Sequence, residues 1–337
     1  MVRELLFRVE LIASVPHCPR MNSSAIASSD QVRRFIFENQ PVRGHWVHLE
    51  SAWRELRAHA SYPPAVTELL GQAVVASVLL AATLKFRGTL TFQLEGNGAV
   101  SLLVAQCTHD FRVRAVARCD QTAVRELTPE GSGARDGAAV FRSLVGDAGR
   151  ITVTVEAEEK SLRYQGIVPL SGASLAESLE VYFASSEQLP TRVLLTADAT
   201  HGAGMLVQKL PGAEHSHRGE SSALEEAWSG AQRGITRLEP DRLREQCIEE
   251  VLAEGFSGHD LRLFRGAPVR FECRCSEGRV AGLLRALGPQ EVREVLKEQG
   301  SVTVTCEFCH RPYRFESVDI DALFAESPGS GGSTAIH

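Results

Sequence analysis

The sequence predicts an α+β protein: an antiparallel-sheet-rich core domain with packed helices, a helical linker and a small C-terminal domain held by four cysteines. Three observations predict this class. Segments with the two-residue periodicity of strands occur in pairs around turn residues. A charged amphipathic stretch follows them, and four of the eight cysteines then fall between residues 273 and 309. With 337 residues, 43% of them hydrophobic, the chain is long and apolar enough for two or three globular domains.

The core domain is expected over residues 31–211. Its longest apolar run, Leu69–Leu84, contains Gly71 and Gln72 and is shorter than the roughly 20 apolar residues that a bilayer requires. We therefore expect a buried helix over 64–84 and no membrane partner.

Strand periodicity then begins. Thr89–Leu94 and Ala99–Ala105 flank a Gly-Asn-Gly turn, which predicts a hairpin because Asn-Gly accommodates positive φ. Ile151–Ala157 and Leu162–Val168 predict a second hairpin. The other elements expected in the core are a strand over 111–118, a helix over 174–186 with Ser174 as its N-cap, and strands over 192–197 and 205–210.

The two ends of the chain lie outside these patterns. Residues 1–30 are expected to be a disordered N-terminal extension, and Arg8 and Glu10 interrupt the apolar run that a signal peptide would need. Residues 327–337 are rich in Gly and Ser and are expected to be a disordered tail. We expect a cytoplasmic protein.

Residues 212–265 predict a charged, amphipathic helical linker. One segment begins at Pro240 and ends at Gly255. Its apolar face carries Leu243, Cys247, Ile248, Val251 and Leu252. Two interpretations stay open. The segment is an ordinary connector packed on the core, which the sequence favours, or a marginally stable linker whose apolar face can be uncovered.

Residues 266–326 contain a C-x-C motif at Cys273 and Cys275 and a C-x-x-C motif at Cys306 and Cys309. Four thiolates in a reducing compartment match a closed tetrahedral zinc site, and the compact paired spacing favours one zinc ion over an iron–sulfur cluster or four unrelated thiols. Ser276 is expected to cap a helix, a second helix ends at Gly300, and strands over 302–305 and 313–315 place the C-x-x-C motif in a hairpin turn. Few apolar residues are available here, so the metal is expected to stabilise the domain.

The remaining cysteines predict no chemistry. Cys107, Cys119 and Cys247 lie at strand-like or apolar helical positions and are expected to be structural, while Cys18 falls in the extension.

Composition and motifs weigh against several function classes. None of the four lysines follows a glycine, so the chain has no G-x-x-x-x-G-K-[ST] phosphate loop. A zinc-knuckle nucleic-acid-binding protein is one alternative, since Arg311 and Arg314 accompany aromatic residues, but the net charge of −6 opposes it. The other alternative is an enzyme with a structural zinc. We expect no enzyme and no catalytic residues, because no H-E-x-x-H motif occurs and Ser174 is better explained as a helix cap.

Several short motifs carry a resemblance to a known family over residues 31–325. They are Phe37-Glu38-Asn39, Val42-Arg43-Gly44, Ala82-Thr83-Leu84-Lys85-Phe86 with Gly88, Tyr164-Gln165-Gly166, Ser186–Arg192, Gly204-Met205-Leu206, Phe271-x-Cys273-x-Cys275-Ser276 and Cys306-x-x-Cys309. Together they make the chain similar to the 33-kDa heat shock protein family of redox-regulated chaperones, and the cysteine spacing is the most specific part.

The resemblance implies an ATP-independent holdase of the oxidative stress response, inactive when reduced and zinc-bound. It implies disulfides Cys273–Cys275 and Cys306–Cys309 on oxidation, followed by zinc release and linker unfolding. Unfolding client proteins would then bind the linker, where we expect Leu243, Ile248, Val251 and Leu252 to contact them. It also implies a homodimer in the oxidised state and no nucleic-acid partner.

Overall fold

The computed structural model describes residues 30–127, 137–158, 163–211 and 218–325. The expected extension and tail lie outside these residues, except for Asp30, whose buried carboxylate accepts hydrogen bonds from the backbone N–H groups of Glu50, Ser51 and Ala52. The chain forms two compact units, one ending at Glu272 and the next beginning at Cys273. The linker region therefore shares a unit with the core, and the finer division at residues 211 and 265 stays a prediction.

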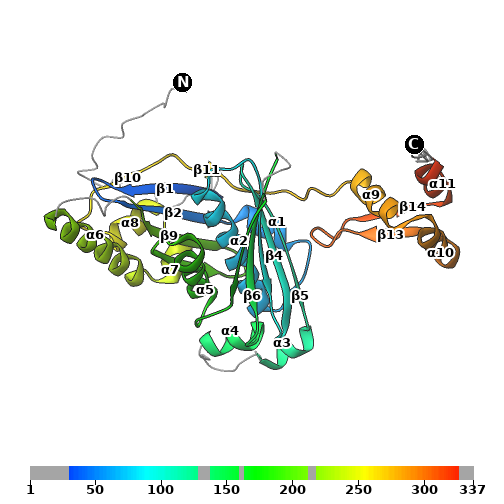
Figure 1. The fold of residues 1–337 in the computed structure, drawn as a ribbon. Coiled ribbons are helices and arrows are strands. Elements are labelled where there is room, and N and C mark those ends of the chain that lie inside the picture. The colour runs from blue at the N-terminus through cyan, green and yellow to red at the C-terminus, as the bar shows by residue number, and fades with distance from the viewer. Residues whose placement is uncertain (1–29, 128–136, 159–162, 212–217, 326–337) are drawn as a thin grey trace, which may run out of the picture. The chain divides into compact units, whose positions relative to one another are not determined.

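The first unit contains two six-stranded sheets, here called sheet A and sheet B (Figure 1). Sheet A has the order β10-β1-β2-β9-β8, with β11 also beside β1. Its strands are β1 (Gln31–Phe37), β2 (Val42–Leu49), β8 (Thr191–Ala197), β9 (Gly202–Lys209), β10 (Leu261–Leu263) and β11 (Ala267–Pro268).

Sheet B has the order β12-β5-β4-β3-β6-β7. Its strands are β3 (Gly88–Glu95), β4 (Val100–Thr108), β5 (Arg112–Cys119), β6 (Arg150–Ala157), β7 (Arg163–Pro169) and β12 (Arg270–Phe271). Every pairing is antiparallel except that of β12 with β5, which confirms the antiparallel-rich α+β class.

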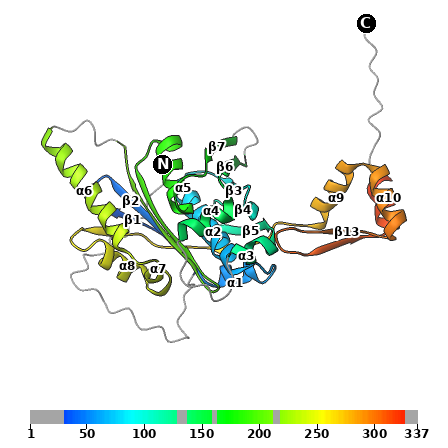
Figure 2. The ribbon, with the colours of Figure 1, turned by 90° about the horizontal axis from the view of Figure 1, so that it is seen from below.

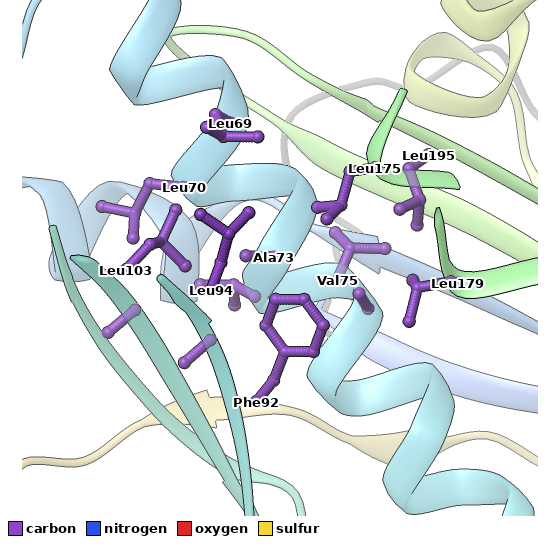
Figure 3. Close-up of a cluster of buried hydrophobic side chains, with 14 of the residues drawn as sticks. Leu69, Leu70, Ala73, Val75, Phe92, Leu94, Leu103, Leu175, Leu179 and Leu195 are labelled. Carbon is purple, nitrogen blue, oxygen red and sulfur yellow. The ribbon is translucent and has the colours of Figure 1, made fainter. Parts of the chain in front are cut away.

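Helix α2 (Pro64–Thr83) occupies the main hydrophobic core, as its apolar run predicts. Figure 3 shows its side chains facing sheet B on one side and α5 (Leu175–Tyr182) and β8 on the other. Within the described part of the chain it is the one helix long and apolar enough to cross a membrane, and 78% of its most apolar window is buried inside the structure. At Gly71 the helix comes so close to β8 that a Cβ there would lie 2.5 Å from the Cβ of Ala197.

Both predicted hairpins are present, as β3–β4 and β6–β7. The predicted helix over 174–186 is α5 followed by a π-helical turn, Phe183–Glu187, and Ser174 caps it by accepting a hydrogen bond from the Glu177 N–H. Several elements were not predicted from the sequence: β1, β2, α1 (Ser51–Arg57), α3 (Gln121–Leu127) and α4 (Gly137–Val145).

The linker region forms α6 (Arg218–Arg237), α7 (Pro240–Glu245) and α8 (Ile248–Gly255). The expectation of one continuous helix from Pro240 to Gly255 is therefore wrong. Gln246 and Cys247 have extended backbone and separate two short helices. The physical reason is orientation. In one helix, Leu243 and Ile248 would point about 140° apart, whereas the break buries both against sheet A.

The second unit is built from α9 (Glu277–Leu287), α10 (Pro289–Gln299), a hairpin of β13 (Val302–Thr305) and β14 (Pro312–Phe315), and α11 (Ser317–Ala325). Ser276 caps α9 and Gly300 ends α10 with φ of 73°, both as predicted. Helix α11 was not predicted. The unit also holds more apolar core than its sequence suggested: Val280, Leu284, Val292, Val302, Tyr313, Phe315, Ile320 and Leu323 pack together.

Candidate metal centre

The structure brings the four cysteines of the second unit together. Cys273 and Cys275 lie just before α9, and Cys306 and Cys309 lie in the turn between β13 and β14. All four sulfur atoms are within 4.8 Å of one another. The Sγ–Sγ distance is 3.7 Å from Cys273 to Cys306 and 3.4 Å from Cys275 to Cys309. The two motifs therefore face each other across one small space.

Backbone hydrogen bonds shape the turn that carries the C-x-x-C motif. The Cys306 N–H donates to the Arg311 carbonyl over 3.0 Å, and the His310 N–H donates to the Cys306 carbonyl over 2.8 Å. His310 has a φ of 52°, so the chain reverses within the turn and directs both sulfurs to the same side. On the other motif, the Arg279 side chain donates to the Arg274 carbonyl and fixes the segment between Cys273 and Cys275.

The donor set fits a tetrahedral ion. Zinc–thiolate bonds of about 2.3 Å place neighbouring sulfurs about 3.8 Å apart, close to the two distances observed here. Cysteines packed this closely without an ion would gain little from one another, since S–H groups are weak donors. The cluster could therefore hold a metal ion.

The thiols are not equivalent. Burial acts to raise the pKa of Cys275, but hydrogen bonds from Tyr313 and the other cysteines outweigh it and lower the pKa to about 7. The Tyr313 hydroxyl donates to Cys275 Sγ over 3.0 Å. Burial raises the pKa of Cys309 to about 12 and raises that of Cys273. Among Cys273, Cys275 and Cys309, only Cys275 therefore has a lowered pKa.

The other described cysteines lie outside this cluster, in the first unit. Cys107 is buried in β4 and its sulfur contacts the Thr108 carbonyl. Cys119 is half-buried at the end of β5, where burial raises the pKa of its thiol. Cys247 precedes α8. These positions agree with structural roles, and Cys18 falls outside the described residues.

A second hydrophobic cluster lies between sheet A and helices α6–α8 (Figure 2). Sheet A contributes Phe35, Phe37, Val42, Trp46, Ala203, Met205 and Val207, and the linker region contributes Trp228, Ala231, Ile235, Leu238, Leu243, Ile248, Val251, Leu252 and Phe256. The four side chains expected to contact clients are at most 6% exposed. In this structure the apolar face of the linker is therefore covered.

Polar contacts also hold the linker on the sheet. Arg33 of β1 pairs with Glu249 of α8 at 2.7 Å. Arg244 of α7 donates to the Thr196 hydroxyl over 2.9 Å and pairs with Asp198 at 3.3 Å. These pairs could not be predicted from the sequence, because each joins residues that lie far apart in the chain.

Comparison with known proteins decides the family. The family model described as Hsp33 protein matches residues 30–316. The chain belongs to the Hsp33 family. Its relatives include the 33 kDa chaperonin of Nitrosococcus oceani, 38% identical over 91% of this chain and 99% of that protein. The 33 kDa chaperonin of Methylobacillus flagellatus is 36% identical over 92% of this chain and 99% of that protein.

The fold agrees with a solved Hsp33 structure. The crystal structure of the 33 kDa chaperonin from Thermotoga maritima superposes with a TM-score of 0.74 at 23% identity, covering 88% of this chain and 98% of that one. Membership makes the chain an Hsp33-type chaperone, and its four-cysteine cluster could hold a metal ion. The resemblance drawn from the motifs is confirmed.

Proposed function

We propose that this Hsp33 protein is an ATP-independent holdase controlled by the redox state of Cys273, Cys275, Cys306 and Cys309. It is inactive while the four thiolates hold one zinc ion. Disulfide formation, release of the ion and unfolding of the linker activate it. The observation that carries the proposal is the combination of a four-sulfur cluster with an apolar linker face that is fully covered.

In the reduced state the four thiolates tie the segment before α9 to the β13–β14 turn. Bound zinc supplies a cross-link that contributes about 10–16 kcal/mol in small zinc domains. The second unit has a small apolar core of its own, and a whole domain is stable by only about 5–15 kcal/mol. Loss of the four ligands is therefore expected to unfold most of this unit.

Oxidation acts on the sulfur atoms. A thiolate attacks peroxide, an S–O bond forms, the O–O bond breaks and hydroxide leaves. A second thiolate then displaces hydroxide from the sulfenic acid and forms the disulfide. We propose the pairs Cys273–Cys275 and Cys306–Cys309. Pairing within each motif consumes all four ligands and removes the connection between the two segments, whereas disulfides across the motifs would keep them together.

The linker provides the binding surface. Leu243, Ile248, Val251 and Leu252 pack against sheet A and become accessible only when α7 and α8 leave it. Contiguous apolar surface of this kind binds unfolding proteins. The abundant charge of the linker would keep such complexes in solution. On this proposal the partners are unfolding proteins and not nucleic acid or membranes, the protein is no enzyme, and the oxidised form is a homodimer in the cytoplasm.

Light scattering from a thermally unfolding client protein tests the proposal. We compare zinc-loaded reduced protein with protein treated with peroxide at mild heat, and Cys119→Ser as a control variant that keeps the cluster. Only the oxidised proteins should suppress scattering, and thiol mapping should show the two proposed disulfides. Equal suppression by the reduced protein, or none by either form, would overturn the redox control.

A further inference from the structure

Tyr313 contacts the four-cysteine cluster directly. It lies in β14, opposite Val304 of β13, and its ring packs in the core of the second unit with 7% exposure. Its hydroxyl donates a hydrogen bond to Cys275 Sγ over 3.0 Å. The Arg311 guanidinium lies 5.4 Å from the ring centroid and supports the ring from the turn.

Cys275 and Tyr313 also line a pocket at the surface of this unit, together with Arg311 and Arg314. The hydrogen bond is therefore located where a small oxidant can approach the sulfur. A thiolate that accepts a hydrogen bond has less electron density available for attack, and an outer-shell hydrogen bond also fixes the orientation of a metal ligand.

We propose that Tyr313 is a positioning residue that retards oxidation of Cys275 and holds this sulfur in the metal site. The inference rests on the proposed function, because it takes the cluster as the zinc site and as the target of the oxidant. Attack on peroxide by Cys275 forms an S–O bond, breaks the O–O bond and expels hydroxide. The electron pair comes from a lone pair on the sulfur, and the hydrogen bond from the tyrosine hydroxyl lowers the nucleophilicity of that sulfur.

Tyr313→Phe removes the hydroxyl and keeps the ring, so the packing in the core is retained. We expect peroxide-dependent zinc release, followed with a chromogenic chelator, to become about tenfold faster. Quenching at early times and mapping the thiols by mass spectrometry should show a larger oxidised fraction at Cys275. The matched control is Tyr164→Phe. Tyr164 lies in β7 of the other unit and its hydroxyl donates to Glu187, so this variant should release zinc at the wild-type rate.

A second measurement tests the same hydrogen bond in case the Tyr313→Phe variant does not bind zinc. Uniform replacement of tyrosine by 3-fluorotyrosine, whose hydroxyl is a stronger donor, should slow zinc release in the wild type and have no effect in Tyr313→Phe. If Tyr313→Phe binds stoichiometric zinc, releases it at the wild-type rate and shows the wild-type oxidised fraction at Cys275, the role of Tyr313 is overturned but the proposed function is not. A wild-type protein that binds no zinc would overturn both this role and the proposed function, and zinc binding without holdase activity would overturn only the latter.

Discussion

On the proposed function the four sulfurs bind one zinc ion together, so the loss of any one of them should remove the metal site. Cys306→Ser replaces a soft thiolate with a hydroxyl that zinc binds poorly, and three cysteines cannot close the tetrahedron. We expect the variant to be purified without stoichiometric zinc, as measured by elemental analysis. Cys247→Ser is the matched control, since this cysteine lies outside the cluster, and it should retain the ion. Full zinc content in Cys306→Ser would refute the assignment of this ligand.

The burial of His45 should make the free energy of unfolding depend on pH. His45 lies in β2 with 3% exposure, and its Nδ1 has no hydrogen-bond partner among the residues that the structure describes. Burial, reinforced by the positive charges of Arg43 and Arg34, lowers its pKa from 6.5 to about 3. The unfolded chain therefore takes up a proton near pH 6.5, whereas the folded chain does so only near pH 3. The neutral, buried His45 thus contributes to the free energy of unfolding in full above pH 6.5, and this contribution is lost as the pH falls toward 3.

The expected loss is about 2 kcal/mol between pH 7 and pH 5. Urea unfolding of the wild type and of His45→Leu at a series of pH values measures the part of this loss that comes from His45. The variant carries no titratable group at this position, so its free energy of unfolding should decline less steeply over this interval. Identical slopes would show that His45 takes up a proton in the folded protein as well.

The clustering of the four cysteines could be predicted from the sequence, but the surroundings of the cluster could not. The spacing of the two cysteine motifs is enough to expect one ion, because each motif can present two sulfurs from a single turn. The contact between Tyr313 and Cys275 depends on the register of β13 with β14 and on the position of a segment 38 residues away. No local pattern in the sequence encodes such a distance.

At the scale of the element, the linker helices should be held on sheet A by their apolar side chains. Leu243 of α7 is fully buried, and Leu243→Ala should cost about 2–5 kcal/mol of the energy that holds α7 in place. We expect faster hydrogen exchange over 240–256 and measurable client binding by the reduced protein. Leu283→Ala is the matched control, because Leu283 is exposed on α9. Unchanged exchange in Leu243→Ala would show that α7 is held by its polar contacts.

Elements with one dominant periodicity were predictable and elements with mixed patterns were not. Helix α2 and the strands β3, β4, β6 and β7 follow a single pattern, because each faces a core on its whole surface or on alternate residues. Residues 31–49 include many charged and half-buried positions, because β1 and β2 face different neighbours on their two sides. The break between α7 and α8 was missed because Leu243, Cys247 and Val251 keep a four-residue spacing that one continuous helix also satisfies. Two helices are required to bury both Leu243 and Ile248 in the cluster with sheet A.

At the scale of the whole molecule, the chain joins one large unit to a small one that carries the cluster. The first unit ends with β11 and β12, which pair with β1 and β5, and with Glu272, which pairs with Arg112 at 2.7 Å. Cys273 follows at once. The first cysteine of the cluster thus follows directly after strand β12 of sheet B and Glu272.

This connection predicts the outcome of a truncation. Deleting residues 273–337 keeps every strand of sheets A and B but removes all four ligands. If the second unit restrains the linker, the truncated protein should suppress client aggregation in the presence of reductant, with no need for peroxide. Light scattering compares client aggregation in the presence of the truncated protein and of reduced full-length protein. The rate of hydrogen exchange over 240–256 should also be higher in the truncated protein. A truncated protein that stays folded but inactive would mean that the oxidised second unit itself takes part in client binding, and activation would then require its disulfides and not merely its loss.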